Sequence, residues 1–497
     1  MFWPRLPEYP NPAPSQAMTT AQGRDTPLGQ ALANQIDAHP GLTGVYPLYS
    51  ALDAFAARYL LIRNAQRTVD VQYYIWGKDL TGTLMLDALI EAADRGVRVR
   101  LLLDDNGICG LDDTLIALAG HANIEVRLFN PFALRWPRWV NYLTDFRRVN
   151  RRMHNKSFTA DGEATIVGGR NIADEYFAGG SGRLFADLDV LAVGQVVDAV
   201  SADFDRYWNC RSAWPVEALL KPARGHPIEG LRRQAETLKT SARAREYLNN
   251  FERSSFVSQF IGGELPMTWS PATLVSDDPR KIIGKPGRKG LVSEQLEKTI
   301  GLPQERLLVV SAYFVPTRSG AKLFAELARS GVEVGVLTNA LEATDVAAVH
   351  SGYSRYRKRL LKAGVKLFEM QRLSGRERMR GTGPLGSSGS SLHAKTFAID
   401  DKRLFVGSFN FDPRSARLNT EMGLVLDSPE LAGQIARTFE KSVPERAYSV
   451  HRDGRGGLYW IEQTERGPRR HAREPHASAW QRFMVAVFGR LPIEWLL

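Results

Sequence analysis

One stretch of sequence occurs twice in this chain: HNKSFTADGEATIVGGRN spans His154 to Asn171, and HAKTFAIDDKRLFVGSFN spans His393 to Asn410. In each copy a Lys follows the His by two positions, an Asp by seven, a Gly by fourteen and an Asn by seventeen. An accidental His-x-Lys-x4-Asp pattern is expected only about 0.02 times in a chain of this composition, so two copies are not a coincidence. A repeat without chemistry would also have little reason to keep a His and a Lys together, because ionisable groups inside a fold are costly unless they are paired or used. The repeat therefore predicts one active site built from two halves of the chain.

The local pattern predicts the geometry of each copy. KSFTA-DG-EATIV and KTFAI-DDK-RLFV each indicate two short strands joined by a tight turn. Residues two apart on a strand share a face, so the His and the Lys of each copy should point the same way, with the Asp at the turn. The helix-like NIADEYF follows the first copy, so Asn171 and its neighbouring amides should lie at a helix N-terminus, where anions are held. A His, a Lys, an Asn and free amides from both copies predict a phosphate pocket.

Two His residues that face one phosphate indicate covalent catalysis followed by acid–base exchange. Near neutral pH an imidazole can be a neutral nucleophile or a protonated acid. One His would attack phosphorus to give a phosphohistidine, while the other protonates the departing alcohol and later deprotonates the incoming one. The two Lys and two Asn residues would stabilise the charge on the non-bridging oxygens. The residues alone do not decide which His takes which role.

The paired H-x-K-x4-D-x6-G-x2-N motifs resemble those of the phospholipase D superfamily. The surrounding words DVQYYIW, GVRVRLLLDDNG, NRRMHNKSF and GGRNIADEYF look like those of bacterial cardiolipin synthases, closest to the C type, and the resemblance runs from about Leu48 to the C-terminal LPIEWLL. It implies an α/β fold of two duplicated phospholipase D-like lobes with mixed sheets and an active site at their pseudo-twofold interface. It also implies a phosphatidyltransferase that forms cardiolipin from phosphatidylglycerol and a second phospholipid, phosphatidylethanolamine or phosphatidylglycerol, through a phosphohistidine.

The resemblance suggests a role for each motif residue. By analogy the first motif His is the nucleophile and the second is the general acid/base. An acidic residue downstream of each motif is expected to orient a His, with Asp189 as a competitor for the first of these roles. The motif Asp residues are expected to brace the turns, and the first copy has Gly169 and Arg170 where the second has Ser408 and Phe409, which makes the two halves unequal. The predicted site comprises the catalytic residues His154, Lys156, Asp161, His393, Lys395 and Asp400, the phosphate-binding residues Asn171, Ser408 and Asn410, and the His-orienting residues Asp187 and Glu421.

Composition limits the other possibilities. At 497 residues and 43% hydrophobic content, the chain is long enough for two or three domains with their own cores. The net charge of +11 favours polyanions, and both nucleic acid and an anionic lipid surface qualify. The two Cys residues are too few for a disulfide framework, and the His residues show no metal-ligand spacing. These features predict a metal-independent enzyme without a cofactor.

The order of strand and helix patterns predicts the domain organisation. Strand, helix and strand alternate between residues 68 and 129 and again between 305 and 370, which is typical of an α/β layer with parallel strands. Tyr74 and Tyr313 both lie 80 residues before their motif His, so the whole lobe is duplicated. The predicted segments are a leader and helix at 1–45, lobe 1 at 46–215, a connector at 216–303 that includes a surface loop at IIGKPGRKG, lobe 2 at 304–450, and a C-terminal segment at 451–497. The Pro-rich start lacks the apolar core of a signal peptide and is interpreted as a flexible leader or as the remnant of a longer N-terminus.

Two basic segments bear on the substrate. FALRWPRWVNYLTDFRRVNRR precedes the first motif and QRLSGRERMRGTGPLGSSGSS precedes the second, and both are expected beside the pocket. Interleaved aromatic and Arg residues suit single-stranded nucleic acid and equally a membrane interface, whereas a solvated basic loop is the plain alternative. The C-terminal WQRFMVAVFGRLPIEWLL could lie on a bilayer, but a helix packed onto the core is the favoured interpretation. Composition leaves lipid and nucleic acid open, and the family resemblance favours lipid.

The sequence thus predicts a cardiolipin-forming phosphatidyltransferase. The alternatives are a phospholipase D that uses water as the acceptor, a metal-independent nucleic-acid phosphodiesterase, and a non-catalytic lipid-binding protein. Expected partners are phospholipids at an anionic membrane surface; a small partner protein is compatible with the resemblance, nucleic acid is not expected, and the oligomeric state is open. No run approaches the roughly 18 apolar residues of a membrane span. The expected location is peripheral, on the bacterial inner membrane.

Overall fold

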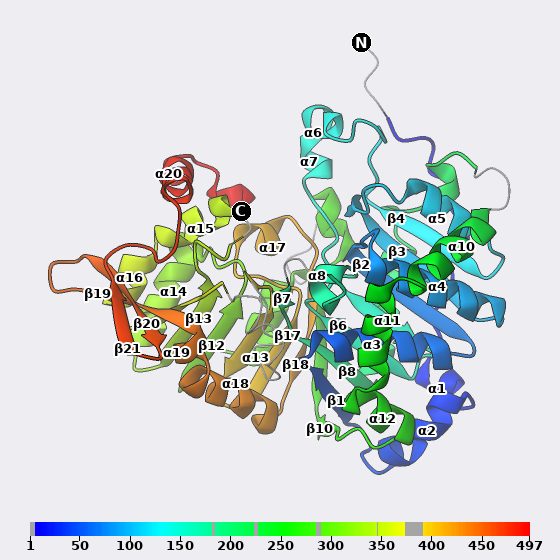
Figure 1. Cartoon of the computed structure of the whole chain (residues 1–497), viewed down its shortest axis with the longest axis horizontal. Coiled ribbons are helices and arrows are strands. Elements are labelled where there is room, and N and C mark those ends of the chain that lie inside the picture. Colours follow the sequence, from blue (N-terminus) through cyan, green and yellow to red (C-terminus); the bar gives the residue numbers. More distant parts are fainter. Residues whose placement is uncertain (1–4, 181–183, 223–226, 285–289, 345, 373–390) are drawn as a thin grey trace.

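Two α/β lobes lie side by side, each built on a large mixed sheet (Figure 1). The structure is a computed structural model that describes residues 5–180, 184–222, 227–284, 290–344, 346–372 and 391–497. The first lobe contains the first motif and the second lobe contains the second. The two motifs meet where the lobes meet.

The sheet of lobe 1 has nine strands in the order β10-β1-β8-β6-β5-β2-β3-β4-β9. Its central strands β2, β3 and β4 are parallel, and β5, β6 and β8 continue the sheet in antiparallel fashion. The bounds are β1 (Thr43–Leu48), β2 (Thr68–Ile75), β3 (Arg98–Gly107), β4 (Ile124–Phe129), β5 (Ser157–Ala160), β6 (Ala164–Gly168), β8 (Asp189–Gly194), β9 (Ala213–Pro215) and β10 (Thr268–Ser270).

The sheet of lobe 2 has ten strands in the order β11-β18-β17-β16-β12-β13-β14-β19-β20-β21. The bounds are β11 (Ala272–Ser276), β12 (Arg306–Ser311), β13 (Glu333–Asn339), β14 (Lys366–Met370), β16 (Lys395–Ile399), β17 (Arg403–Gly407), β18 (Met422–Leu426), β19 (Ala447–Arg452), β20 (Leu458–Thr464) and β21 (Gly467–His471). The order β8-β6-β5-β2-β3-β4 of lobe 1 thus reappears as β18-β17-β16-β12-β13-β14. The predicted duplicated α/β fold is confirmed.

Helices cover the sheets and close each lobe. The parallel strands are buried on both faces because helices pack on them, which explains their nearly continuous apolar sequence. In lobe 1 and the connector the helices are α1 (Thr20–Gly23), α2 (Pro27–Asp37), α3 (Ala51–Asn64), α4 (Leu80–Asp94), α5 (Asp112–Ala119), α6 (Val140–Thr144), α7 (Phe146–Val149), α8 (Asp174–Phe177), α9 (Val196–Trp208), η1 (Val216–Ala218), α10 (Pro227–Lys239), α11 (Ala242–Glu252), α12 (Ser255–Gly262), η2 (Pro279–Ile283) and α13 (Val292–Ile300). In lobe 2 and the C-terminal segment they are α14 (Thr317–Arg329), α15 (Ala347–Ser354), α16 (Arg357–Lys362), α17 (Pro413–Arg417), α18 (Pro429–Lys441), α19 (Val443–Arg446), α20 (Ala479–Phe488) and η5 (Glu494–Leu496).

The N-terminal segment and the connector are integrated into the lobes. The hydroxyl of Tyr9 donates to the carbonyl of Ala213 at 3.3 Å, and the amide of Ala17 donates to the carboxylate of Asp205 at 2.8 Å. The interpretation of a flexible leader is therefore wrong for the residues between Tyr9 and Ala17. The connector contributes β10 to the sheet of lobe 1 and β11 to the sheet of lobe 2, so it joins the two lobes through strands. Its predicted surface loop at IIGKPGRKG includes residues 285–289, which lie outside the described residues.

The C-terminal segment extends lobe 2 and ends in an exposed helix. Strands β20 and β21 continue the sheet beyond β19. Helix α20 lies against α15 and contains no buried residue, and Trp480 and Phe483 are 66% and 56% exposed. The favoured interpretation, a helix packed onto the core, is wrong for this apolar face, because the neighbouring helix covers only one side of α20.

A shared apolar core holds the lobes together. One cluster of buried side chains combines residues of lobe 1, such as Val167 and Leu188, with residues of lobe 2, such as Leu404 and Leu424. Two short strands, β7 (Phe185–Ala186) and β15 (Ser391–Leu392), pair in parallel across the boundary. Two lobes joined by a common core form a rigid support for a site between them.

Candidate active site

Each motif His is fixed by the backbone of the opposite lobe. The amide of His154 donates to the carbonyl of Thr420 at 2.8 Å, and the amide of His393 donates to the carbonyl of Ala186 at 2.8 Å. Neither lobe could hold its His in this position alone. The two halves of the site are thus related by a crossed arrangement that agrees with the predicted pseudo-twofold interface.

In the first half, Nδ1 of His154 lies 2.8 Å from Oε2 of Glu421. The His side chain is 10% exposed and the Glu side chain is fully buried. The Nζ atom of Lys156 donates to the carbonyl of His154 at 2.6 Å and lies 5.9 Å from the ring centroid of Tyr74. With Nδ1 on a carboxylate, the lone pair of a neutral imidazole is on Nε2, which leaves this atom for chemistry.

In the second half, Nδ1 of His393 lies 2.6 Å from Oδ2 of Asp187. The Nζ atom of Lys395 lies 2.8 Å from Nδ1 and 3.1 Å from Nε2 of the same ring, and it also contacts the carbonyl of His393. The ring packs against Tyr176 and Phe185, with centroid distances of 5.1 Å for both. Each ammonium group thus contacts the carbonyl of its own motif His, and that of Lys395 also lies beside the ring of His393.

Burial and charge change the protonation of the site. Burial, reinforced by Lys156 and opposed by Glu421, lowers the pKa of His154 to about 4. Burial lowers the pKa of Lys156 to about 7, with Glu421 opposing it. The pKa of His393 is lowered by burial and by Lys395. Burial opposes ionisation of Asp187, but His393 and Lys395 outweigh it and hold the pKa of this carboxyl below its ordinary value. Near pH 7 these shifts favour a neutral imidazole on both His residues and an ionised Asp187.

The His-orienting acids come from the opposite lobes. Glu421, downstream of the second motif, contacts the first His, and Asp187, downstream of the first motif, contacts the second. Sequence order alone would instead pair each acid with the motif His that precedes it, Asp187 with His154 and Glu421 with His393. Asp189 lies 2.8 Å from Nη2 of Arg58, and its Oδ1 accepts a hydrogen bond from the amide of Arg170. Asp189 therefore contacts neither His and forms a buried ion pair within lobe 1.

The motif Asp residues lie at the hairpin turns. The carboxylate of Asp161 accepts hydrogen bonds from the amides of Gln66, Arg67 and Thr68 at 2.8–2.9 Å. In lobe 2, Asp400 accepts hydrogen bonds from three successive amides in the same way, those of Gln304, Glu305 and Arg306. Each Asp ties its hairpin to the start of the first parallel strand. This is the bracing geometry that the family resemblance implies.

The motif Asn residues are engaged with backbone and Tyr groups of their own lobes. Oδ1 of Asn171 accepts from the amide of Ile75 at 3.2 Å, and Nδ2 donates to the hydroxyl of Tyr176 at 2.9 Å. Oδ1 of Asn410 accepts from the amide of Tyr313 at 3.4 Å. These Asn residues fix the ends of β2 and β12 beside the site.

The predicted anion site at a helix N-terminus is wrong. Helix α8 has only four residues, and its first amide, that of Asp174, donates to the carboxylate of Asp79 at 2.8 Å. In lobe 2, α17 begins with Pro413 and is capped by Asp412. Carboxylates thus already occupy the place where an anion would bind.

Gly169 and Arg170 of the first copy correspond to Ser408 and Phe409 of the second, and Ser408 and Arg170 make different contacts. The hydroxyl of Ser408 donates to Oε2 of Glu421 at 2.5 Å and accepts from the amide of Met422. The guanidinium of Arg170 donates to the carbonyls of Leu48, Tyr49 and Asp187. Ser408 therefore supports the acid that holds His154, while Arg170 supports the backbone around the acid that holds His393.

Two further groups complete the site and were not assigned from sequence. The ring of Tyr74 meets that of His154 edge to face at 5.1 Å. The carboxylate of Asp277, from the connector, accepts the amide of Glu421 at 2.8 Å and the Nζ of Lys281 at 2.9 Å. The shared 80-residue spacing of Tyr74 and Tyr313 was a signal for the first group. Nothing in the connector sequence marked the second, because its partner is 144 residues away.

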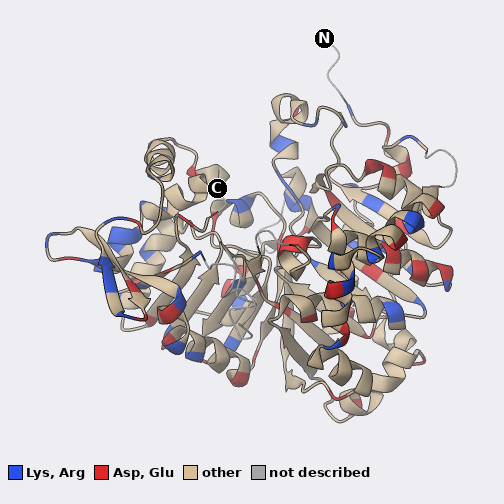
Figure 2. Ribbon diagram, viewed as in Figure 1, with Lys and Arg blue, Asp and Glu red and all other residues tan. Residues whose placement is uncertain are grey.

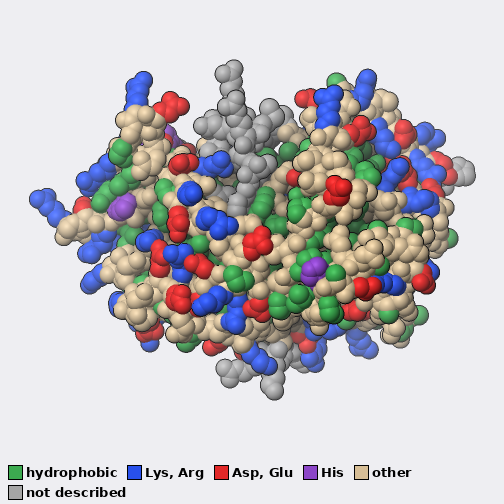
Figure 3. All heavy atoms as spheres, turned by 90° about the horizontal axis from the view of Figure 1, so that it is seen from below, with side chains coloured by type: hydrophobic (Ala, Val, Ile, Leu, Met, Phe, Trp, Pro, Cys, Tyr) green, Lys and Arg blue, Asp and Glu red, His purple; other side chains and the backbone are tan. Residues whose placement is uncertain are grey.

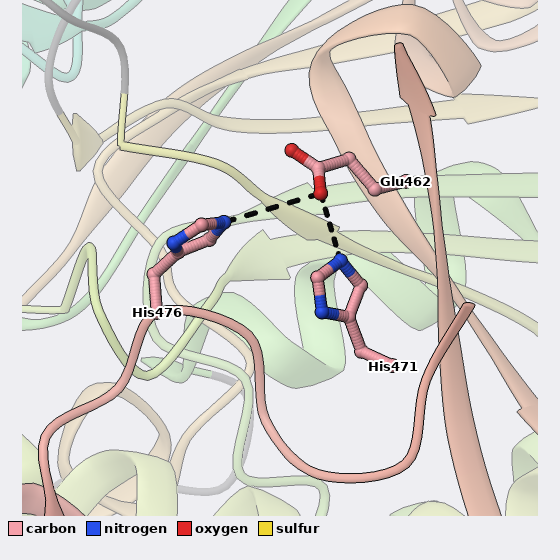
Figure 4. Close-up of side chains that lie close together, drawn as sticks. All are labelled: Glu462, His471 and His476. Atoms are coloured by element: carbon pink, nitrogen blue, oxygen red, sulfur yellow. Dashed lines mark hydrogen bonds and ion pairs between the residues drawn. The ribbon is translucent and has the colours of Figure 1, made fainter. Parts of the chain in front are cut away.

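Among the described residues, one group could hold a metal ion: Glu462, His471 and His476, whose ligand atoms lie within 4.8 Å of one another (Figure 4). Nε2 of His471 and Oε2 of Glu462 are 2.7 Å apart, and Nε2 of His476 is 3.9 Å from the same oxygen. The group lies on the outer strands β20 and β21 and the loop that follows, away from the lobe interface (Figure 1). A histidine–carboxylate hydrogen bond accounts for this cluster, and it has no contact with the paired motifs.

Duplicated α/β lobes that share two crossed His–Lys pairs define a protein of the phospholipase D class. The family model described as cardiolipin synthase, PLD-like domain, matches residues 60–208 and 296–443, once in each lobe. The chain therefore belongs to the cardiolipin synthase family of phospholipase D-like proteins.

Individual relatives agree with this family. Cardiolipin synthase C of Escherichia coli (strain K12) is 48% identical over 471 residues, which are 95% of this chain and 99% of that protein. An uncharacterized protein of Helicobacter pylori (strain ATCC 700392 / 26695) is 34% identical over 418 residues, 82% of this chain and 81% of that protein. The crystal structure of phosphatidylserine synthase from Haemophilus influenzae Rd KW20 matches with a TM-score of 0.59 and 14% identity, over 95% of this chain and 100% of that chain. This structural match shows the same fold.

Proposed function

We propose that this protein is a phosphatidyltransferase that forms cardiolipin from phosphatidylglycerol and a second phospholipid through a phosphohistidine. The observation that carries this proposal is the crossed pair: two His residues, each with Nδ1 on a buried carboxylate of the opposite lobe and each followed by a Lys. The 48% identity to a cardiolipin synthase supports the choice of lipid as substrate. Such a pair can form and break one phosphodiester without a metal ion.

We assign the attack on phosphorus to His154. The lowered pKa, about 4, keeps its imidazole neutral near pH 7, and Glu421 favours the tautomer with the lone pair on Nε2. Nε2 would bond to the phosphorus of the donor lipid, the bond from phosphorus to the headgroup oxygen would break, and His393 would give its proton to that oxygen. An anionic phosphodiester beside His393 offsets the positive charge of Lys395, so substrate binding favours the protonated acid that this step needs.

The second step reverses the proton transfer. The neutral His393 would take the proton of the primary hydroxyl of phosphatidylglycerol, the freed oxygen would attack phosphorus, and the bond between phosphorus and His154 would break. Cardiolipin is released and both His residues return to their starting states. Lys156 and Lys395 supply positive charge for the non-bridging oxygens in both steps. With water as the acceptor the same sequence gives phosphatidic acid.

We further propose a peripheral location at the bacterial inner membrane, where the phospholipid substrates lie. No described helix is both long and apolar enough to cross a membrane. A small partner protein is compatible with this location, and copurification from membranes would test for one. The headgroup that the reaction releases would show whether the donor is phosphatidylethanolamine or phosphatidylglycerol.

The experiment that tests this function is incubation of the purified protein with vesicles of phosphatidylglycerol and phosphatidylethanolamine in the presence of EDTA. Mass spectrometry of the lipids should show cardiolipin with the wild type and none with His154→Ala. Phosphatidic acid alone would mean that hydrolysis is the activity. No lipid product, together with metal-free cleavage of DNA that is lost in His154→Ala, would identify a nucleic-acid phosphodiesterase instead.

A further inference from the structure

The exposed large aromatic side chains of the described residues gather in two segments. We call residues 135–149, which include α6 and α7, arm 1, and residues 478–497, which include α20 and η5, arm 2. All exposed Trp and Phe side chains of the described chain belong to one of these arms. They are Trp136 at 84%, Trp139 at 62% and Phe146 at 39% in arm 1, and Trp480 at 66%, Phe483 at 56% and Trp495 at 51% in arm 2.

The two arms come from different lobes and project on the same side of the molecule. In Figure 1, α6 and α7 rise from lobe 1 and α20 rises from lobe 2, both toward the top. Arg414 joins the ends of the two arms. Its Nη2 donates to Oδ1 of Asn150, which follows arm 1, at 2.8 Å, and its backbone amide donates to the carbonyl of Leu497 at 2.7 Å. Because Arg414 lies four residues after Asn410, this junction adjoins the second motif.

Arm 1 is also connected to the first motif His. The hydroxyl of Tyr142 in α6 donates to Oδ1 of Asn106 at 2.9 Å, and Nδ2 of Asn106 donates to the hydroxyl of Tyr74 at 3.0 Å. The ring of Tyr74 then contacts that of His154. Helix α6 of arm 1 is thus connected to His154 through two hydrogen bonds and one ring contact.

Ion pairs hold the loop of arm 1 in place. Arg138 lies 2.7 Å from the carboxylate of Asp112, and Arg135 contacts both Asp105 and Asp112. Trp136 and Trp139 alternate with these anchored Arg residues, so the two indole rings are presented to solvent by a fixed loop. A fixed apolar surface loses little conformational entropy when it is covered.

The charge around arm 1 favours an anionic partner. Residues 135–152 contain six Arg and one Asp, and Figure 2 shows basic positions along the α6–α7 projection. Four of these Arg residues form ion pairs with carboxylates, whereas Arg147 and Arg151 form none with the described residues. On the face seen from below, basic and acidic side chains are interspersed (Figure 3). Tryptophan rings prefer the headgroup depth of a bilayer, and Arg residues there meet lipid phosphates. The side that carries the arms therefore combines the two features that an anionic bilayer recognises.

We propose that arm 1 and arm 2 together form the surface that docks this protein onto an anionic phospholipid bilayer, with one arm inserting from each lobe beside the paired motifs. This inference rests on the proposed function, because it takes the substrate to lie in the bilayer. Docking through both lobes places their shared site against the membrane, so that a lipid headgroup can reach the His pair without leaving the surface. A bilayer suits two separate projections better than a small protein ligand does, since it is flat and continuous.

The test measures vesicle binding by flotation with phosphatidylglycerol and phosphatidylethanolamine vesicles. We expect Trp136→Ala/Trp139→Ala and Trp480→Ala/Phe483→Ala each to weaken binding about tenfold, since each removes two rings from the interface. The matched control is Ile261→Ala, which removes an equally exposed apolar side chain, 71% exposed, from α12 at the bottom of Figure 1. The control and His154→Ala should bind as the wild type does. Arm variants that bind as tightly as the wild type would overturn the proposal.

Activity on a soluble substrate separates this inference from the proposed function. With short-chain phosphatidylglycerol below its micelle concentration, the arm variants should make product at rates within about twofold of the wild type, while they lose activity on vesicles. Equal losses on both substrates would overturn the docking role. A wild type that binds vesicles through the arms but transfers no phosphatidyl group from either substrate would contradict the proposed function alone. A wild-type dimer that the arm substitutions dissociate, with vesicle binding unchanged, would make this surface an interface between copies and would also overturn the proposal.

Discussion

In the first half of the site Glu421 holds His154 and is itself held by the hydroxyl of Ser408. In the second half Asp187 holds His393, and Gly169, which has no side chain to donate a hydrogen bond, stands at the position of that Ser. The ammonium groups differ as well. Both contact the carbonyl of their own motif His, but only that of Lys395 also lies beside the two ring nitrogens. The backbone and the charged groups are therefore duplicated, while the contacts of those groups are not. Unequal halves suit a reaction in which one His is bonded to phosphorus and the other exchanges a proton.

Removing either His should have the largest effect and should also separate the two roles. We expect His154→Ala to lower cardiolipin formation about 10⁴-fold or more, because no nucleophile remains. His393→Ala should slow both steps about 10²- to 10⁴-fold, because proton transfer is lost. The measurement is the initial rate on vesicles, with circular dichroism as a check on folding. Equal residual rates in both variants, with no covalent adduct in either, would contradict the division of roles.

Removing the crossed carboxylates should have the next largest effect. Glu421→Gln should lower the rate about 10²- to 10⁴-fold because the imidazole of His154 loses the group that fixes its tautomer, and Asp187→Asn should do the same for His393. The measurements are the initial rate of cardiolipin formation and the ¹⁵N NMR spectrum of the His side chains. Glu421→Gln should perturb the resonance of His154 and leave that of His393 in place. A perturbation of His393 by this variant would mean that the pairing follows sequence order.

The matched control for these carboxylates is Asp189→Asn. Asp189 is fully buried on Arg58 and contacts neither His. We expect this variant to lower the melting temperature, because it leaves a buried guanidinium without its counter-charge. The His resonances should stay unchanged. A shift of either His resonance in this variant would mean that Asp189 does help to orient a motif His.

Ser408→Ala tests the asymmetry directly. The hydroxyl donates to Oε2 of Glu421, so its loss removes one hydrogen bond to a buried charge and should lower the rate about tenfold. The NMR signature should resemble a weak form of Glu421→Gln. Arg170→Ser should instead lower stability, because the guanidinium holds three backbone carbonyls. A rate loss larger for Arg170→Ser than for Ser408→Ala, at equal stability, would reverse this part of the comparison.

The turn carboxylates should affect stability more than chemistry. We expect Asp161→Asn to lower the free energy of unfolding by about 1–3 kcal/mol, because an amide nitrogen would face backbone N–H donors. Asp400→Asn should cost less, since Asp400 is closer to solvent. Burial opposes its ionisation, but three backbone amides lower the pKa of Asp400. The stabilisation of the fold by the ionised Asp400 is thus complete above the ordinary Asp pKa. It is lost as the pH falls through the lowered pKa of Asp400 in the folded protein.

The measurement for the turn carboxylates is urea unfolding at pH 7 and near pH 3. The deficit of Asp400→Asn against the wild type should shrink at the lower pH. The rate per folded molecule should change little for either variant. A catalytic loss as large as that of the motif His variants, at unchanged stability, would place these Asp residues in the reaction.

Most of the fold could be predicted because its signals are local. The alternation of apolar strands and helices predicts each parallel layer, and the repeated motif predicts the duplication. The sequence did not predict the edge strand β10 or its neighbour β1, because both are short and pair with strands far along the chain. The apolar face of α20 was misassigned because sequence alone does not show which side of a helix is covered.

The site was predictable in its members but not in its pairings. The spacing of the repeat identifies both His–Lys pairs, and the family resemblance identifies Glu421 and Asp187. Which acid meets which His depends on how the lobes pack, and no local pattern contains that information. The same limit applies to Asp277, which contacts the site from the connector.

The most direct test of this account is to trap the covalent intermediate. His393→Ala should be incubated with phosphatidylglycerol and digested, and the peptides should be read by mass spectrometry under conditions that preserve phosphohistidine. Our account predicts a phosphatidyl adduct on the peptide that contains His154 and none in the matched His154→Ala protein. An adduct on His393 in the His154→Ala protein, or wild-type turnover with no adduct in either variant, would contradict it.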